Sequence, residues 1–116
     1  MDLITKIFGK PAPGISPVEV QQKLSQKNKF LLLDVRQPEE FRNEHIKGAR
    51  LIPLNDLQRR MHELPKNQEI VCVCRSGSRS QTAARQLRAA GYTVINLNGG
   101  MIAWTRAGLP VNKGKA

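Results

Sequence analysis

The sequence predicts an α/β domain built on a mostly parallel sheet. Short apolar runs of strand length alternate with segments whose apolar residues recur at helical spacing. Such alternation is typical of strand–helix–strand units, whose strands lie parallel in one sheet. The chain has 116 residues, 40% of them hydrophobic and 24% charged, which favours one globular domain over a disordered or fibrous chain.

The first half predicts, in order, a helix at 17–27, a strand at 30–35, a short helix at 38–41 and a short strand at 49–52. The first helix has a recognisable start, with Ser16 as N-cap, Pro17 in the first turn and Glu19 as the capping-box partner. The run at 30–35 is apolar almost without interruption, which predicts a strand covered on both faces.

The second half predicts a helix at 54–64, a strand at 70–73, a helix at 79–90, a strand at 93–97 and a last short helix starting at 99–100. Leu54, Leu57, Met61 and Leu64 repeat at helical spacing and so define the first of these helices. Gly91 is the expected C-terminal cap of the helix at 79–90.

The net charge is +10, and no acidic residue follows Glu69. An acid-free basic half favours an anionic ligand there, although a solvated basic surface explains it equally well. Aromatic residues are only 4% of the chain, which argues against nucleic-acid binding by base stacking.

The chain has two cysteines and two histidines, and these small numbers exclude some kinds of disulfide and metal site. They are too few for a disulfide framework or a four-thiolate zinc site, and His45 and His62 lack metal-ligand spacing, so we expect no metal. No apolar stretch approaches the roughly 20 residues of a membrane span. The first residues carry an acid where a signal peptide needs bases. We therefore expect a cytoplasmic protein that does not bind membranes.

Cys74 is the candidate nucleophile. It ends a predicted buried strand and opens the segment Cys74-Arg75-Ser76-Gly77-Ser78-Arg79-Ser80, which leads into a helix. Ligands of open α/β sheets bind at the carboxyl ends of strands, and small residues let such a loop turn its N–H groups inward as an anion-binding nest. Those donors would hold Cys74 as a thiolate. Cys72 lies inside the strand and is expected to be a buried hydrophobe; a Cys72–Cys74 disulfide relay is an alternative with awkward geometry.

Several separate segments, in this order and spacing, resemble the rhodanese domain of the single-domain sulfurtransferase type over about residues 14–110. These segments are Leu33-Asp34-Val35-Arg36 with Pro38-Glu39-Glu40-Phe41, His45-Ile46-Lys47-Gly48-Ala49 with Ile52-Pro53, the Cys74 loop, Ala83-Ala84 with Leu87, Gly91-Tyr92, and Leu97-Asn98-Gly99-Gly100 with Trp104. We expect residues 1–13 to be an amphipathic stub and linker, and 111–116 a short, loose basic tail.

The resemblance implies a three-layer fold around a five-stranded, mainly parallel sheet. It makes Cys74 the sulfur-carrying nucleophile and the substrate-binding loop the residues that follow it, namely Arg75, Ser76, Gly77, Ser78, Arg79 and Ser80. Arg75 and Arg79 are expected to recruit an anionic donor. Asp34 and Arg36 would support the site or form a structural ion pair, and His45 is expected to be a structural hydrogen-bonding residue.

The implied activity is that of a thiosulfate sulfurtransferase. Through a Cys74 persulfide, it would move sulfane sulfur from thiosulfate or a similar small anion to cyanide, a small thiol or a protein thiol, without metal or organic cofactor. A sulfur carrier and a non-catalytic regulatory module are the alternatives. A cysteine phosphatase or arsenate reductase is less favoured, because those loops resemble Cys-x5-Arg and only four residues separate Cys74 from Arg79.

Overall fold

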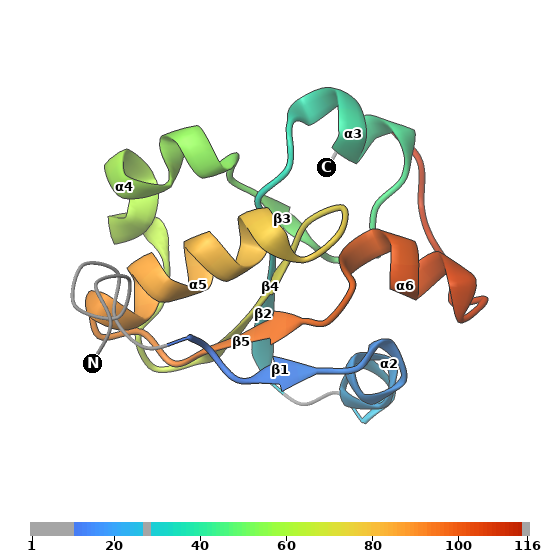
Figure 1. Cartoon of the computed structure of the whole chain (residues 1–116), viewed down its shortest axis with the longest axis horizontal. Helices are drawn as coiled ribbons and strands as arrows, with labels where there is room; N and C mark the ends of the chain where they lie inside the picture. Colours follow the sequence, from blue (N-terminus) through green and yellow to red (C-terminus); the bar gives the residue numbers. More distant parts are fainter. Residues whose placement is uncertain (1–10, 27–28, 115–116) are drawn as a thin grey trace.

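The computed structural model describes residues 11–26 and 29–114, so the stub expected at 1–10 lies outside the described residues. Five strands form one all-parallel sheet, in the order β1-β5-β4-β2-β3 (Figure 1). Their bounds are β1 Gly14–Ile15, β2 Phe30–Asp34, β3 Arg50–Leu51, β4 Glu69–Val73 and β5 Val94–Leu97. The predicted α/β class and the five-stranded sheet are confirmed, and β4 occupies the central position.

Helices cover both faces of this sheet, which makes three layers. The α-helices are α2 Pro17–Ser25, α3 Pro38–Asn43, α4 Leu57–Arg60, α5 Ser78–Ala89 and α6 Gly100–Arg106. Helices α2, α3 and α6 pack into one core cluster through Val20, Phe41 and Trp104. Helices α4 and α5 pack into the other through Leu57 and Leu87. None of the helices in the described part of the chain is long and apolar enough to cross a membrane.

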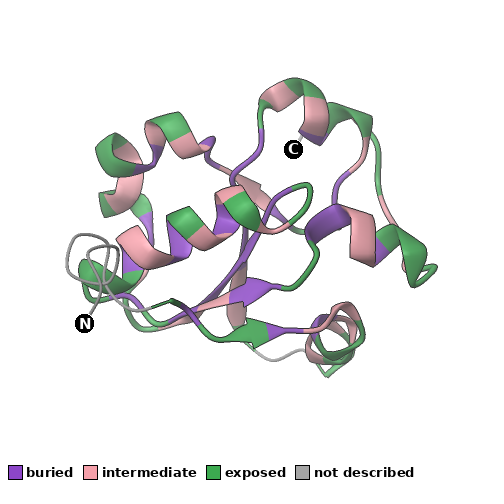
Figure 2. Ribbon diagram, viewed as in Figure 1, coloured by how far each residue is buried: buried purple, intermediate pink, exposed green. Residues whose placement is uncertain are grey.

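Strand β2 illustrates why the sheet needs both layers. Its neighbouring residues Leu32 and Leu33 are 3% and 0% exposed and belong to opposite core clusters. Fully burying a leucine side chain stabilises the fold by about 1.5–3 kcal/mol. The last three residues of β2 and the last four of β4 are buried, and Figure 2 shows buried residues along the central strands.

Two elements differ from the sequence-based expectation. The single helix expected at 54–64 is wrong, because two 3₁₀ turns, Leu54–Asp56 and Met61–Glu63, flank the four-residue α4. The outer apolar pairs of this segment are three residues apart, which is the period of a 3₁₀ turn. Strand β1 was missed because two residues between Pro13 and Ser16 carry no readable alternation.

The described part of the C-terminal tail, up to Gly114, is hydrogen-bonded to residues in and after α3, whereas the tail was expected to be loose. Asn112 and His45 exchange backbone hydrogen bonds of 2.9 and 2.8 Å, and the Gly114 N–H donates to the carbonyl of Arg42 at 2.8 Å. The tail therefore lies against the segment that leaves α3.

The start of α6 fixes the loop that follows β4. The Met101 N–H donates to the carbonyl of Cys74 at 2.8 Å, and the Ile102 N–H donates to the carbonyl of Arg75 at 3.0 Å. Gly100 has a φ of +57°, and a Cβ atom at that position would overlap both of these carbonyl oxygens. Only glycine satisfies this close approach together with the left-handed backbone.

We predict that Gly100→Ala destabilises the protein by about 3 kcal/mol, because it adds a backbone overlap to the strain of a positive φ. Gly108→Ala is the matched control, since Gly108 has a φ of +73° and nothing within 4 Å of its would-be Cβ. The control should cost only about 1 kcal/mol. Urea unfolding of both variants measures the difference, and equal costs would contradict the close-approach explanation.

Candidate active site

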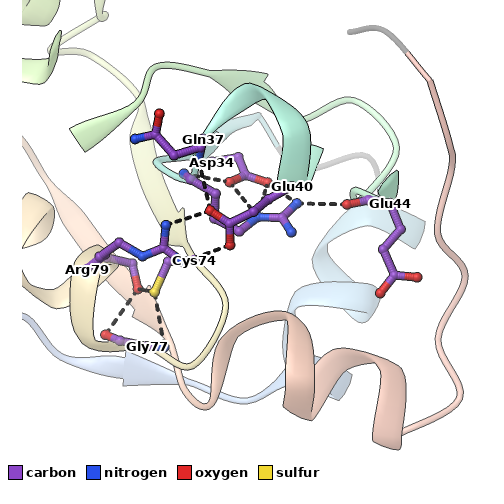
Figure 3. A network of polar contacts seen from close by, with 9 residues as sticks. Asp34, Gln37, Glu40, Glu44, Cys74, Gly77 and Arg79 are labelled. Atoms are coloured by element: carbon purple, nitrogen blue, oxygen red, sulfur yellow. Dashed lines mark hydrogen bonds and ion pairs between the residues drawn. The ribbon is translucent and has the colours of Figure 1, made fainter. Parts of the chain in front are cut away.

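Cys74 follows the last residue of β4, at the carboxyl edge of the sheet where α/β proteins bind ligands. The neighbouring strands β2 and β5 end beside it, and the residue is 1% exposed. Figure 3 shows its sulfur near the start of α5, below the side chain of Glu40.

Two donors approach the sulfur. The Gly77 N–H donates to Cys74 Sγ at 3.1 Å, and the hydroxyl of buried Ser80 lies 3.3 Å from the same atom. Gly77 is the N-cap of α5 and has a φ of +108°, which turns its N–H back toward the sulfur. Among the backbone amides in 11–26 and 29–114, only that of Gly77 donates a hydrogen bond to this sulfur. The anion-binding nest around Sγ therefore consists of one amide and one hydroxyl.

Asn96 of β5 holds the loop by a hydrogen bond, a role that was not predicted from the sequence. This residue of β5 is 5% exposed, and its Nδ2 donates to the carbonyl of Gly77 at 3.3 Å. The Gln81 N–H and the Ser80 hydroxyl reach the same carbonyl at 3.1 and 3.2 Å. Two amide donors thus hold the Gly77 carbonyl, and the Ser80 hydroxyl is shared between this carbonyl and the sulfur. A polar residue at the third position of an otherwise apolar strand was the available signal.

The second cysteine behaves as predicted from its place in the strand. Cys72 is fully buried in the core cluster shared with α5. Burial raises the pKa of the Cys72 thiol, and the neighbouring Cys74 raises it further. Cys72 is therefore held as a neutral thiol, which is neither a good nucleophile nor exposed to substrate.

Asp34 and Arg36 form a buried ion pair at the end of β2. Arg36 Nε and Nη2 donate to the Asp34 carboxylate at 2.9 and 2.8 Å, and Nη2 also donates to the carbonyl of Glu44 at 2.8 Å. Both side chains are at most 5% exposed. This geometry fits the structural alternative, in which the pair fixes the connection from β2 to α3.

A second ion pair, not anticipated from the sequence, joins α3 to the loop. Arg79 donates from Nη1 and Nη2 to the two carboxylate oxygens of Glu40, at 2.7 and 2.8 Å (Figure 3). The hydrogen bonds from Arg79 lower the pKa of Glu40 to about 2. Arg75, by contrast, is exposed and makes no ion pair with any described residue. It is therefore the loop cation available to an incoming anion.

A cavity of about 530 Å³ borders the loop on the side of α3. Its walls come from α3, α6, the tail and the loop, through Arg36, Glu40, Glu44, Arg75, Ile102 and Lys113, among others. Cys74 does not line this cavity, which touches the loop through Arg75. Ser76 and Ser78 are exposed, so the structure gathers Gly77 and Ser80 at the sulfur and leaves the other loop side chains outside.

The two histidines lie away from the sulfur contacts. The Nδ1 of His45 lies 2.8 Å from the carbonyl of Phe41, and its ring stacks on the Phe41 ring with centroids 3.9 Å apart. His45 thus has the geometry of the structural residue that was expected, and His62 is exposed.

We predict that Glu40→Gln lowers the free energy of unfolding by about 0.5–1 kcal/mol near neutral pH, the range for a partly solvated ion pair. Because the pKa of Glu40 is lowered in the folded state, its contribution is present above about pH 4.5 and disappears as the pH falls toward 2. Urea unfolding at pH 6 and pH 2.5 should therefore show a gap between the two proteins only at pH 6. Glu39→Gln, on the same helix turn, should leave no such gap, and a gap that does not change with pH would contradict the pairing.

Comparisons with known proteins agree with this fold. The family model for the rhodanese-like domain matches residues 16–107. A protein of Allochromatium vinosum named Sulfurtransferase is 41% identical over 98 residues, which span 84% of this chain and 92% of the relative. The Putative sulfur carrier protein YrkF of Bacillus subtilis is 42% identical over 94 residues, which span 80% of this chain and 51% of that protein. A rhodanese-related protein from Thermoplasma volcanium matches with a TM-score of 0.81 and 25% identity, over 86% of this chain and 97% of the other. The chain therefore belongs to the rhodanese-like domain family.

Proposed function

We propose that the protein is a sulfurtransferase that carries sulfane sulfur on Cys74. In the first step the Cys74 thiolate attacks the outer sulfur of thiosulfate or a similar anionic donor. The sulfur–sulfur bond of the donor breaks, its electron pair leaves with sulfite, and Cys74 becomes a persulfide. The observation that carries this proposal is the convergence of the Gly77 N–H and the Ser80 hydroxyl on Cys74 Sγ.

In the second step a nucleophile removes the sulfur. Cyanide or a thiolate attacks the terminal sulfur of the persulfide, and Cys74 leaves as a thiolate, so the enzyme returns to its first state without an oxidant or reductant. This is covalent catalysis in two half-reactions, which gives ping-pong kinetics. Because sulfur supplies both nucleophile and leaving group, the reaction requires neither metal nor organic cofactor.

The names of the relatives support this class of chemistry. One relative is named a sulfurtransferase and another a putative sulfur carrier. The carrier alternative differs from the enzyme in its donor, because a carrier would receive sulfur from a dedicated protein and would not turn over thiosulfate.

We predict that incubation with thiosulfate adds the mass of one sulfur atom to the native protein, and that Cys74→Ser abolishes this addition. Cys72→Ala is the matched control and should retain most of the loading, because the Cys72 thiol is buried among apolar residues. Intact mass spectrometry reads out all three proteins.

Equal loss of loading in both variants would contradict the single-nucleophile mechanism and favour a relay between the two cysteines. A native protein that hydrolyses aryl phosphate efficiently and leaves thiosulfate untouched would contradict sulfur transfer altogether. A protein inactive toward both would favour the carrier or a non-catalytic module.

We also predict that Arg75→Gln raises the KM for thiosulfate about three- to fivefold at low salt, the range for an exposed charge pair. The effect should shrink with ionic strength, because salt screens exposed charges. Lys29→Gln removes the same charge from the residue before β2, at the opposite edge of the sheet, and should leave KM unchanged. Steady-state kinetics at 20 mM and 500 mM salt, on the order of a fivefold change in Debye length, make the comparison. If neither the Arg75 substitution nor added salt changes the KM for thiosulfate, the loop backbone and not the Arg75 side chain binds the donor.

A further inference from the structure

A second hollow flanks the loop on the side of α6. It has a volume of about 450 Å³ and lies among Pro17, Ser76, Ile102, Ala103, Arg106 and Ala107. Ile102 also lines the cavity on the α3 side, so its side chain stands between the two hollows. The hollow is thus a mainly apolar surface that borders the loop through Ser76.

A further exposed apolar side chain lies on the first turn of α2. Val18, the residue after Pro17, is 53% exposed and is the one exposed large hydrophobic side chain in 11–26 and 29–114. Apolar surface rimmed by polar residues is typical of sites where proteins bind one another. A small hydrophilic acceptor such as cyanide would gain nothing from contact with this apolar surface.

Arg106 is the one charged side chain among the described residues that line the hollow, and it is basic. None of the described residues that line it is acidic, and Arg106 is exposed and without a described ion-pair partner, as is Arg75 on the adjoining loop. In sequence, the acid nearest to these lining residues is Glu19, two positions after Pro17, and its carboxylate accepts from the Ser16 N–H at 3.2 Å. On the α3 side, by contrast, Glu40 and Glu44 line the cavity.

We propose that the α6 hollow is the docking surface for the sulfur acceptor, and that this acceptor is a protein presenting a thiol next to an apolar side chain and acidic residues. The apolar side chain would enter between Ile102 and Pro17, while the acids face Arg106 and Arg75. The acceptor thiolate attacks the terminal persulfide sulfur, gains a sulfur–sulfur bond, and releases Cys74 as a thiolate. This proposal rests on the proposed function and specifies its second substrate.

The test uses the full chain, loaded with thiosulfate and desalted, so loading is measured before transfer. Two synthetic acceptor peptides carry a cysteine beside a leucine, one with glutamates and the other with lysines around the pair. Each peptide's intrinsic thiol reactivity is first measured with a small aromatic disulfide, and the transfer rate is divided by it. We expect the normalised rate for the acidic peptide to be about tenfold higher at low salt, with the difference closing as salt is added.

Variants locate the surface. Arg106→Glu should remove or reverse the preference for the acidic peptide and leave loading from thiosulfate intact. Lys29→Glu makes the same charge change before β2 and should keep the preference. Replacing the peptide leucine by serine should slow transfer from the native protein more than from Ile102→Ala.

Three outcomes would overturn the proposal while leaving the sulfurtransferase function standing. They are equal normalised rates for the two peptides, a neutral small thiol that unloads the protein as fast as the acidic peptide, and equal effects of Arg106→Glu and Lys29→Glu. Failure of the native protein to load would instead refute the proposed function itself.

Discussion

The site depends on where the backbone carbonyls of Cys74 and Arg75 point. The first amides of α6 bind both carbonyls, and Gly100 provides the clearance for that approach. With its carbonyls directed to α6, the loop can turn the Gly77 N–H toward the sulfur. A peptide unit that faced the other way would present an oxygen to the sulfur and would repel a thiolate. Gly100, although distant from the loop in sequence, therefore helps to set the loop's conformation.

Two of the arginines near the site, Arg36 and Arg79, are paired with carboxylates. Arg79 lies in the first turn of α5, where its guanidinium binds Glu40, and the guanidinium of Arg36 binds Asp34. The Asp34–Arg36 pair fixes the connection from β2 to α3, and the Glu40–Arg79 pair joins α3 to the start of α5. The sulfur consequently depends on short hydrogen bonds for its immediate stabilisation, while exposed Arg75 acts over a longer range. Burial of the Asp34–Arg36 pair adds little net stability, because taking two charges out of water costs free energy that their attraction offsets.

Much of the fold could be predicted from the sequence, because the patterns that specify each helix or strand lie within a few neighbouring residues. The Ser16 capping box and the apolar run at 30–35 each specify an element from neighbouring residues alone. The partners of the loop were not readable, because Glu40 meets Arg79 across 39 residues and the Asn96 amide meets Gly77 across 19. Nor does a two-residue strand such as β1 carry periodicity. The position of a loop between a buried strand and a helix was thus predictable from sequence, whereas the contacts that hold this loop depend on the tertiary structure.

The hydroxyl of Ser80 has two acceptors and one proton. It lies 3.3 Å from Cys74 Sγ and 3.2 Å from the carbonyl of Gly77, so it serves one of them at a time. In the proposed cycle the negative charge sits first on Sγ and then one bond further out. Rotation about a single C–O bond lets the proton follow that change, toward the sulfur when it is charged and toward the carbonyl when it is not. A buried site with a rigid backbone can accommodate two charge distributions through this one rotor.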